Sequence, residues 1–186
     1  TLERVKSSKI LLDLLKLIAF QVGSEVSLTE LGQQLLLDYK TVARYLDLLE
    51  KCFILYNLRG YSRNLRTEVT KKSKYFFYDN GIRNAIISNF NPLDTRNDHG
   101  ALWENFLISE RLKYQKYSPL YANNYFWRTW DQKEVDFLEE REGKLFGFEF
   151  KYSSTDNPRV PALFRSTYPE STYEVITPKN YQGFIS

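Results

Sequence analysis

The spacing of hydrophobic and polar positions in the first half of the chain predicts three helices. Leucine and isoleucine recur at helical intervals over residues 8–21, with polar side chains between them. Ser27 and Glu30 have the spacing of a capping box, which predicts a short helix from Ser27 to about Leu36. Asp38 is a good N-cap for a third helix. The apolar positions of that helix are Val42, Leu46, Leu49 and Phe53.

Two strand-like segments follow, at residues 53–58 and 75–78, and the sequence between them is basic. Two closely joined helices followed by such a hairpin predict a winged helix-turn-helix over residues 1–80. Its third helix would enter a DNA groove and the basic segment would be the wing. The expected DNA contacts are Lys40, Arg44, Arg59, Arg63, Arg66, Lys71 and Lys72. The alternative is a small helical subdomain that docks on a protein, because a fold does not fix a function.

The second half of the chain predicts an α+β domain over residues 81–186. A short helix at residues 82–87 and a loop at 89–100 lead into a long helix, 101–117, which has a buried apolar stripe. Three strands, a helix and a further strand then follow, so that helices cover a mixed sheet. Their expected ranges are 125–129, 133–139, 145–151, 160–168 and 173–177.

The hairpin between the second and third of these strands predicts a pair of facing carboxylates. Glu142-Gly143 suits a two-residue turn, with glycine supplying a positive φ. Continuing that register places Asp136 opposite Glu149 and Glu134 opposite Lys151. Val135, Phe137, Phe148 and Phe150 would point to the other, packed face.

Two acids held so close repel each other unless a cation offsets their charge. We therefore expect a Mg²⁺ or Mn²⁺ site at Asp136 and Glu149, with Lys151 stabilising charge or orienting water, as in metal-dependent phosphodiesterases. Glu104, one turn into the long helix, is a candidate fourth group. The alternative is a metal-free, solvated charge cluster in which Lys151 bridges Glu149 and Glu134, a type of contact that contributes little stability.

The amino-acid composition limits the class of protein and its cellular location. The hydrophobic fraction of 42% is sufficient for folded cores, and the longest apolar stretch is interrupted by charges, so we expect no membrane span. Cys52 stands alone within a helical pattern, where we expect it to be buried, and a cytoplasmic location is the simplest interpretation. A single histidine, His99, argues against zinc sites and a Ser-His-Asp triad. The chain starts without methionine and has no phosphate-binding loop, so we expect a fragment that does not hydrolyse ATP by itself.

Several segments resemble the C-terminal region of bacterial and archaeal ATPases of the AAA+ superfamily. The segments that carry the resemblance include Lys40-Thr-Val-Ala-Arg-Tyr-Leu-Asp, Phe76-Phe-Tyr-Asp-Asn-Gly, Trp103-Glu-Asn, Glu134-Val-Asp-Phe and Phe148-Glu-Phe-Lys. In that family an N-terminal ATPase core precedes a winged helix and a domain of unknown function similar to PD-(D/E)XK nucleases, the fold of Holliday junction resolvases.

The resemblance implies a restriction-endonuclease-like αβββαβ domain. It assigns Asp136, Glu149 and Lys151 to the nuclease motif and Glu104 to the additional acid on the preceding helix. It also implies that ATP and the ATPase domain belong to the longer protein. Two hypotheses follow: a metal-dependent DNA endonuclease, or a non-catalytic module that binds DNA or protein. The sequence leaves open whether the chain forms a homo-oligomer.

Overall fold

The computed structural model describes residues 2–61, 72–129, 132–153 and 160–186, and it divides the chain into two compact units. Unit 1 comprises Thr1–Asn57 with Lys72–Ala101, and unit 2 comprises Leu58–Lys71 with Leu102–Ser186. The α+β class is confirmed, because helices accompany a mixed arrangement of parallel and antiparallel strands. Residues 81–101, which we assigned to the second domain, group with unit 1. Part of the reason is that Arg83 in this segment is buried and donates to the backbone oxygen of Ala19.

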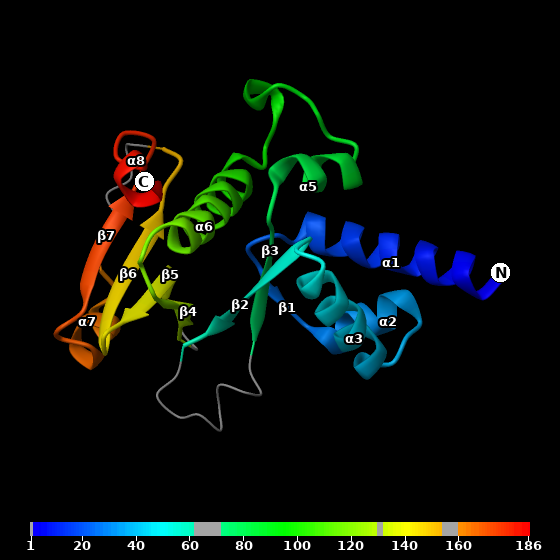
Figure 1. The fold of residues 1–186 in the computed structure, drawn as a ribbon, viewed down its shortest axis with the longest axis horizontal. Helices are drawn as coiled ribbons and strands as arrows, with labels where there is room; N and C mark the ends of the chain where they lie inside the picture. Colours follow the sequence, from blue (N-terminus) through cyan, green and yellow to red (C-terminus); the bar gives the residue numbers. More distant parts are fainter. Residues whose placement is uncertain (1, 62–71, 130–131, 154–159) are drawn as a thin grey trace. The chain divides into compact units, whose positions relative to one another are not determined.

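Unit 1 begins with three helices interrupted by a short strand (Figure 1). In chain order its elements are α1 (Leu2–Phe20), β1 (Glu25–Val26), α2 (Leu28–Leu35), α3 (Tyr39–Lys51), β2 (Leu55–Gly60), β3 (Ser73–Phe77), α5 (Asn80–Ile86) and a 3-10 turn at Leu93–Thr95. The last residues of β2 belong to unit 2. β1 pairs antiparallel with β3, and β3 lies next to β2. The core joins apolar residues of all three helices to β2 and β3, and includes Leu14, Ile18, Leu31, Val42, Leu46, Leu49, Leu55 and Phe76.

The predicted caps of α2 and α3 are confirmed. The Ser27 hydroxyl accepts from the Glu30 amide at 3.3 Å, and the Asp38 carboxylate accepts from the Thr41 amide at 2.9 Å. Gly32 permits the tight connection between the helices, because a Cβ at this position would lie 2.6 Å from the Leu37 carbonyl oxygen. The short connection between α2 and α3 therefore requires glycine at this position.

Two expectations at the end of α3 were wrong. Phe53 is 71% exposed, because the helix ends at Lys51 and Phe53 itself adopts a φ of 56°, which turns its side chain out of the apolar stripe. Cys52, the C-cap of this helix, is exposed and not buried.

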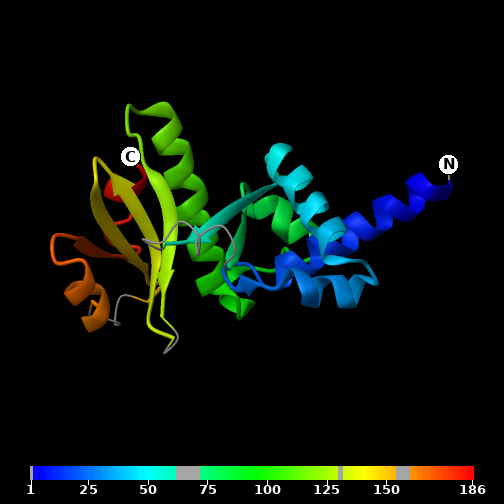
Figure 2. The same cartoon turned by 90° about the horizontal axis from the view of Figure 1, so that it is seen from below.

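Unit 2 is built on strands that carry helices on both faces. Its elements are α6 (His99–Tyr117, which begins in unit 1), β4 (Asn123–Arg128), β5 (Glu134–Arg141), β6 (Lys144–Phe150), α7 (Ala162–Thr167), β7 (Thr172–Ile176) and α8 (Gln182–Ile185). The strand order is β2-β4-β5-β6-β7, in which β4, β5 and β6 form an antiparallel meander and β2 and β7 pair in parallel at its edges. Figure 2 shows α6 and α7 on opposite sides of the meander.

A β-bulge in β5 separates two apolar clusters. Tyr125 pairs with Leu138 but Trp127 pairs with Val135, so β5 contains one residue more than β4 over this interval. Val135 therefore packs with Leu138 and with Phe164 of α7. We expected Val135 to share a face with Phe137, and that expectation was wrong, because the extra residue reverses the alternation. Phe137 instead contacts Phe148, Phe150 and Phe184 of α8.

Candidate metal centre and nucleic-acid interface

The β5–β6 hairpin brings Asp136 close to the end of β6. The turn residues Glu142 and Gly143 have φ values of 50° and 76°, as a type I′ turn requires, and the predicted register holds from Arg141↔Lys144 to Phe137↔Phe148. Beyond Phe137↔Phe148 the backbone hydrogen bonds between β5 and β6 end, and a side chain of β5 bonds the backbone of β6 instead. The Asp136 carboxylate accepts a hydrogen bond from the Phe150 amide at 2.8 Å, because the bulge frees Asp136 from regular pairing.

Glu149 lies beside two donors. The Lys151 ammonium is 2.7 Å from its Oε1, and the Tyr173 hydroxyl donates to its Oε2 at 3.3 Å. Burial raises the pKa of the Tyr173 phenol well above its ordinary value. The negative charge and hydrogen bond of Glu149, and then the charge of Asp136, raise this pKa further. The Glu149 side chain is 12% exposed and that of Lys151 is 32% exposed, so the charged groups are partly shielded from water.

The structure thus groups three of the four predicted site residues: Asp136, Glu149 and Lys151. Among the described residues no three His, Cys, Asp or Glu side chains come close enough to hold one metal ion, so Glu104 does not join the two acids as a third ligand. Glu104 is half-buried in α6. Glu134 lies 3.5 Å from Arg128, which is a different ion pair from the Lys151 bridge considered in the sequence.

The donor chemistry of this pair suits a small divalent cation. Mg²⁺ is commonly held by one or two protein carboxylates, with water and substrate phosphate completing its coordination. Asp136 and Glu149 offer two such groups on adjacent strands, and both are half-buried. We refer to Asp136, Glu149, Lys151 and Tyr173 as the acidic site.

A cluster of aromatic side chains around Trp103 was missed by the sequence analysis. Tyr152, directly after Lys151, is 44% exposed and lies edge-on to Trp103 with ring centroids 6.1 Å apart. Trp103 also contacts Tyr181 at 5.4 Å and stacks on Phe106 at 5.8 Å. Only the tertiary structure unites these rings, because they come from α6, the end of β6 and the chain segment before α8.

Unit 1 carries the predicted nucleic-acid contacts of α3. Lys40 and Arg44 are both exposed, as are Asp47 and Lys51, which form an ion pair at 2.7 Å. Arg59 at the end of β2 is exposed as well. Lys72 is exposed, but its ammonium lies 2.6 Å from the Glu25 carboxylate, so its charge is already offset. Arg63, Arg66 and Lys71 lie outside the described residues.

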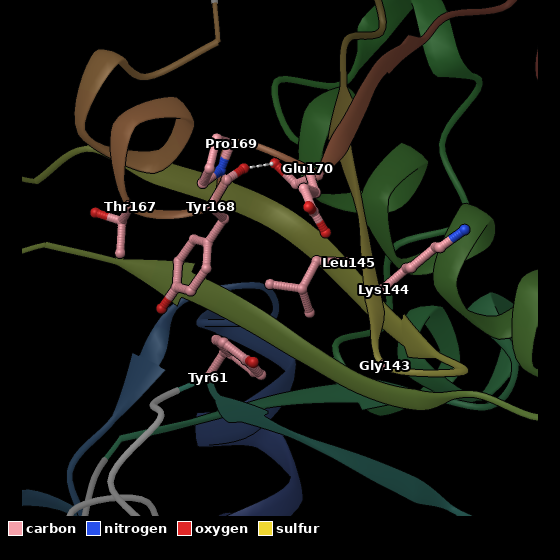
Figure 3. A pocket seen from close by; sticks show the side chains of 9 residues that line it. Tyr61, Gly143, Lys144, Leu145, Thr167, Tyr168, Pro169 and Glu170 are labelled. Carbon is pink, nitrogen blue, oxygen red and sulfur yellow. Dashed lines mark hydrogen bonds between the residues drawn. The ribbon is translucent and has the colours of Figure 1, made fainter.

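A separate hollow of about 330 Å³ opens on the α7 side of unit 2 (Figure 3). Tyr61 and Tyr168 line it and lie edge-on to each other with centroids 5.7 Å apart. The Lys144 ammonium is directed away from the hollow in Figure 3. Asp136 and Glu149 do not line the hollow, so it is distinct from the acidic site.

Within the described residues, no helix combines the length and the apolar character needed to cross a membrane.

Comparison with known proteins finds relatives without an assigned activity. The chain is 28% identical over 152 residues to uncharacterized proteins of Mycobacterium bovis and Mycobacterium tuberculosis, which covers 81% of this chain and 33% of each relative. It is 25% identical over 158 residues to an uncharacterized protein of Haemophilus influenzae, covering 82% of this chain and 36% of that protein. The chain therefore spans about a third of the length of these relatives. No solved structure matches it.

Two family models match successive parts of the sequence. The model for Domain of unknown function (DUF4143) covers residues 99–182. The model for Domain of unknown function (DUF8612) covers residues 1–93, which is half of the chain. The interval between the two matches falls in the segment that leads into α6. The chain thus belongs to the family described as Domain of unknown function (DUF8612).

Proposed function

We propose that this chain is the DNA-binding, metal-dependent nuclease-like C-terminal region of an ATPase of the AAA+ superfamily. In this proposal unit 1 is a winged helix-turn-helix, and unit 2 is a nuclease-like domain of the PD-(D/E)XK type. The observation that carries it is the grouping of Asp136, Glu149 and Lys151 at the end of the β5–β6 hairpin. Structural ion pairs rarely need two acids on adjacent strands, whereas phosphodiester cleavage uses them.

The proposed roles follow from the chemistry of each side chain. Asp136 and Glu149 would hold Mg²⁺ or Mn²⁺, which when bound supplies a Lewis acid for the phosphate and lowers the pKa of water. Lys151 presents an ammonium at this site and would stabilise negative charge on the phosphate or orient the attacking water. The bulge fixes Asp136 through the Phe150 amide, so that its carboxylate has a defined direction before any ligand binds.

The surroundings favour nucleic acid as the substrate. The exposed ring of Tyr152, one residue after Lys151 and beside Trp103, offers a stacking surface for an unpaired base. In unit 1 the order helix, strand, two helices and two strands is that of a winged helix, and α3 presents Lys40 and Arg44 to solvent. Both features suit DNA that is bound by unit 1 and cut, where unpaired, by unit 2.

A cleavage assay on linear and branched DNA with Mg²⁺ or Mn²⁺ tests the proposal. Asp136→Asn, Glu149→Gln and Lys151→Ala should each reduce the cleavage rate by on the order of 100-fold or more, because each removes a group that acts on the phosphate or the water. Glu134→Gln is the matched control, since it neutralises an acid on the same strand that pairs with Arg128. Cleavage that survives all three site variants would overturn the nuclease assignment.

A second candidate function has its own support. Lys151, Tyr173 and the Phe150 amide already satisfy the two carboxylates without a metal, which favours a retired nuclease scaffold that serves as a binding module. Thermal melting separates the two candidates. If Asp136 and Glu149 bind Mn²⁺, millimolar Mn²⁺ raises the melting temperature of the native chain but not that of Asp136→Asn. Identical melting curves with and without metal in both proteins would favour the binding module.

A further inference from the structure

Unit 2 contains a cavity of about 380 Å³ between β6, β7 and α8 that the proposed nuclease chemistry does not use. Its walls include two guanidinium groups and three phenylalanine rings. The principal lining residues are Arg111, Arg141, Phe146, Phe148 and Phe184. Phe148 contacts Phe184 on this side of β6, whereas its neighbour Glu149 contacts Tyr173 and Lys151 at the acidic site. Successive residues of a strand point to opposite faces, so the Glu149 carboxylate lies on the face of β6 opposite the cavity, and Tyr173 is the residue of the acidic site that also lines the cavity.

A fully buried carboxylate supports the floor of this cavity. Glu139 has 0% exposure and accepts from Arg111 through both oxygens, at 2.6 and 3.0 Å. Gln115 donates to it at 2.7 Å, and Arg141 lies 3.0 Å from its Oε2. Arg111 also donates to the backbone oxygen of Phe184. Two guanidinium cations therefore share one carboxylate, which leaves one positive charge in excess.

Arg141 is the guanidinium whose hydrogen-bonding capacity is incomplete. Its Nε is buried and has no hydrogen-bond partner among the described residues. The guanidinium lies over the Phe146 ring at 3.7 Å from the centroid, and burial lowers its pKa below the ordinary value for arginine. Glu174 at the cavity rim is exposed, so water screens its charge. An excess cation that lines a partly desolvated cavity is an arrangement in which a second anion would balance the charge.

We propose that this cavity binds a phosphate group through Arg141. A planar guanidinium matches phosphate by two parallel hydrogen bonds, and the excess charge favours an anion of at least one charge. The group could belong to inorganic phosphate or to a nucleotide, whose base would meet the phenylalanine walls. The proposal is independent of metal binding at Asp136 and Glu149, since neither carboxylate lines the cavity.

Titration calorimetry on the intact chain in excess EDTA, at constant ionic strength set with chloride, tests this site. EDTA removes divalent metal, so phosphate cannot bind through an ion at the acidic site. Inorganic phosphate and adenosine monophosphate are the probes. Both should bind saturably to the native protein, and tighter binding of the nucleotide would show that the aromatic walls contribute, whereas equal binding would assign the affinity to the phosphate group alone.

Arg141→Gln should weaken phosphate binding at least tenfold. Lys144→Gln is the matched control, because it removes the same charge from the residue that pairs with Arg141 across the turn but does not line the cavity. Equal affinity in these two variants would refute the site, as would an absence of saturable binding to the native chain. If Arg141→Gln fails to fold, Arg141→Lys retains the charge and loses the planar fork. Weaker binding by that variant supports the proposal, and native-like binding overturns it.

Discussion

Neutralising Glu139 should destabilise unit 2 more than any other single-charge change in this unit that conserves side-chain size. Glu139→Gln preserves the shape of the side chain but removes the charge that Arg111 and Arg141 share. The amide nitrogen of the glutamine would also direct its hydrogens at the guanidinium groups, which are themselves hydrogen-bond donors. The substitution therefore leaves buried cations without their counter-charge while creating little empty space.

The burial of Arg111 and Glu139 determines how much stability the substitution removes. The side chains of Arg111 and Glu139 are 6% and 0% exposed, so neither charge regains much solvation in the folded variant. Breaking a buried ion pair by removing one partner costs about 3–5 kcal/mol. For a unit of this size a loss of that order lowers the melting temperature by roughly 15 °C or more. Replacing both partners, as in Arg111→Met with Glu139→Met, should recover part of this loss, because no charge of the pair then remains buried.

Tryptophan fluorescence during denaturant unfolding measures this effect in unit 2 alone. The three tryptophans of the chain, Trp103, Trp127 and Trp130, all belong to the residue ranges of unit 2. Glu140→Gln is the control, because the adjacent Glu140 accepts an exposed hydrogen bond from Asn123 at 3.4 Å and is not part of the buried ion pair. If the unfolding free energies of Glu139→Gln and Glu140→Gln agree within about 1 kcal/mol, the typical size of a surface effect, the buried-pair argument is refuted.

Two further predictions concern unit 1. Hydrogen bonds from Arg96 hold the pKa of Asp98 well below its ordinary value of 3.8. Burial opposes this lowering, and Arg83 reinforces it. The stabilising effect of Asp98 is therefore complete at neutral pH and is lost as the pH falls below that value. Asp98→Asn should lower the free energy of unfolding by on the order of 2 kcal/mol at pH 7 and by progressively less in acid. Hydrogen exchange of residues 80–101 measures this loss, and a stability difference between the two proteins that does not change with pH would contradict the assignment. For DNA binding, Lys40→Ala with Arg44→Ala should weaken affinity and flatten its salt dependence by fluorescence anisotropy, whereas Lys51→Ala, whose charge is offset by Asp47, should do so less. Equal effects of the two changes would argue against α3 as the DNA-contacting helix.

Local patterns in the sequence predicted most of the secondary structure. The caps at Ser27 and Asp38 depend on side chains within three residues of the amides that they bond, so sequence spacing reveals them. The β5–β6 hairpin was equally readable, because the positive φ values of Glu142 and Gly143 and the alternation of apolar residues fix its register up to Phe137↔Phe148. Asp136 lies beyond the last paired residues of this hairpin, where its carboxylate bonds the Phe150 amide.

The sequence did not predict where that rule stops. The bulge in β5 depends on how β4 packs beside it, and the alternation around Val135 gives no sign of the extra residue. The same holds for Phe53, whose apolar character fits a helical stripe although the backbone has already left the helix. Hydrophobic periodicity reports which side chains favour burial, but long-range packing decides which of them obtain it.

By itself, then, the sequence determined the α+β class, most of the helices and strands in their order, and the hairpin register up to Phe137↔Phe148. The tertiary structure alone decided that, among the described residues, Glu104 forms no three-carboxylate metal group with the two acids. It also decided that residues 81–101 group with unit 1, and that Arg111 and Glu139 are buried partners. The physical reason is the range of the interactions. Turns, caps and hairpin register arise between residues a few positions apart, whereas a charged residue looks the same in sequence whether water or a partner 28 positions away neutralises it.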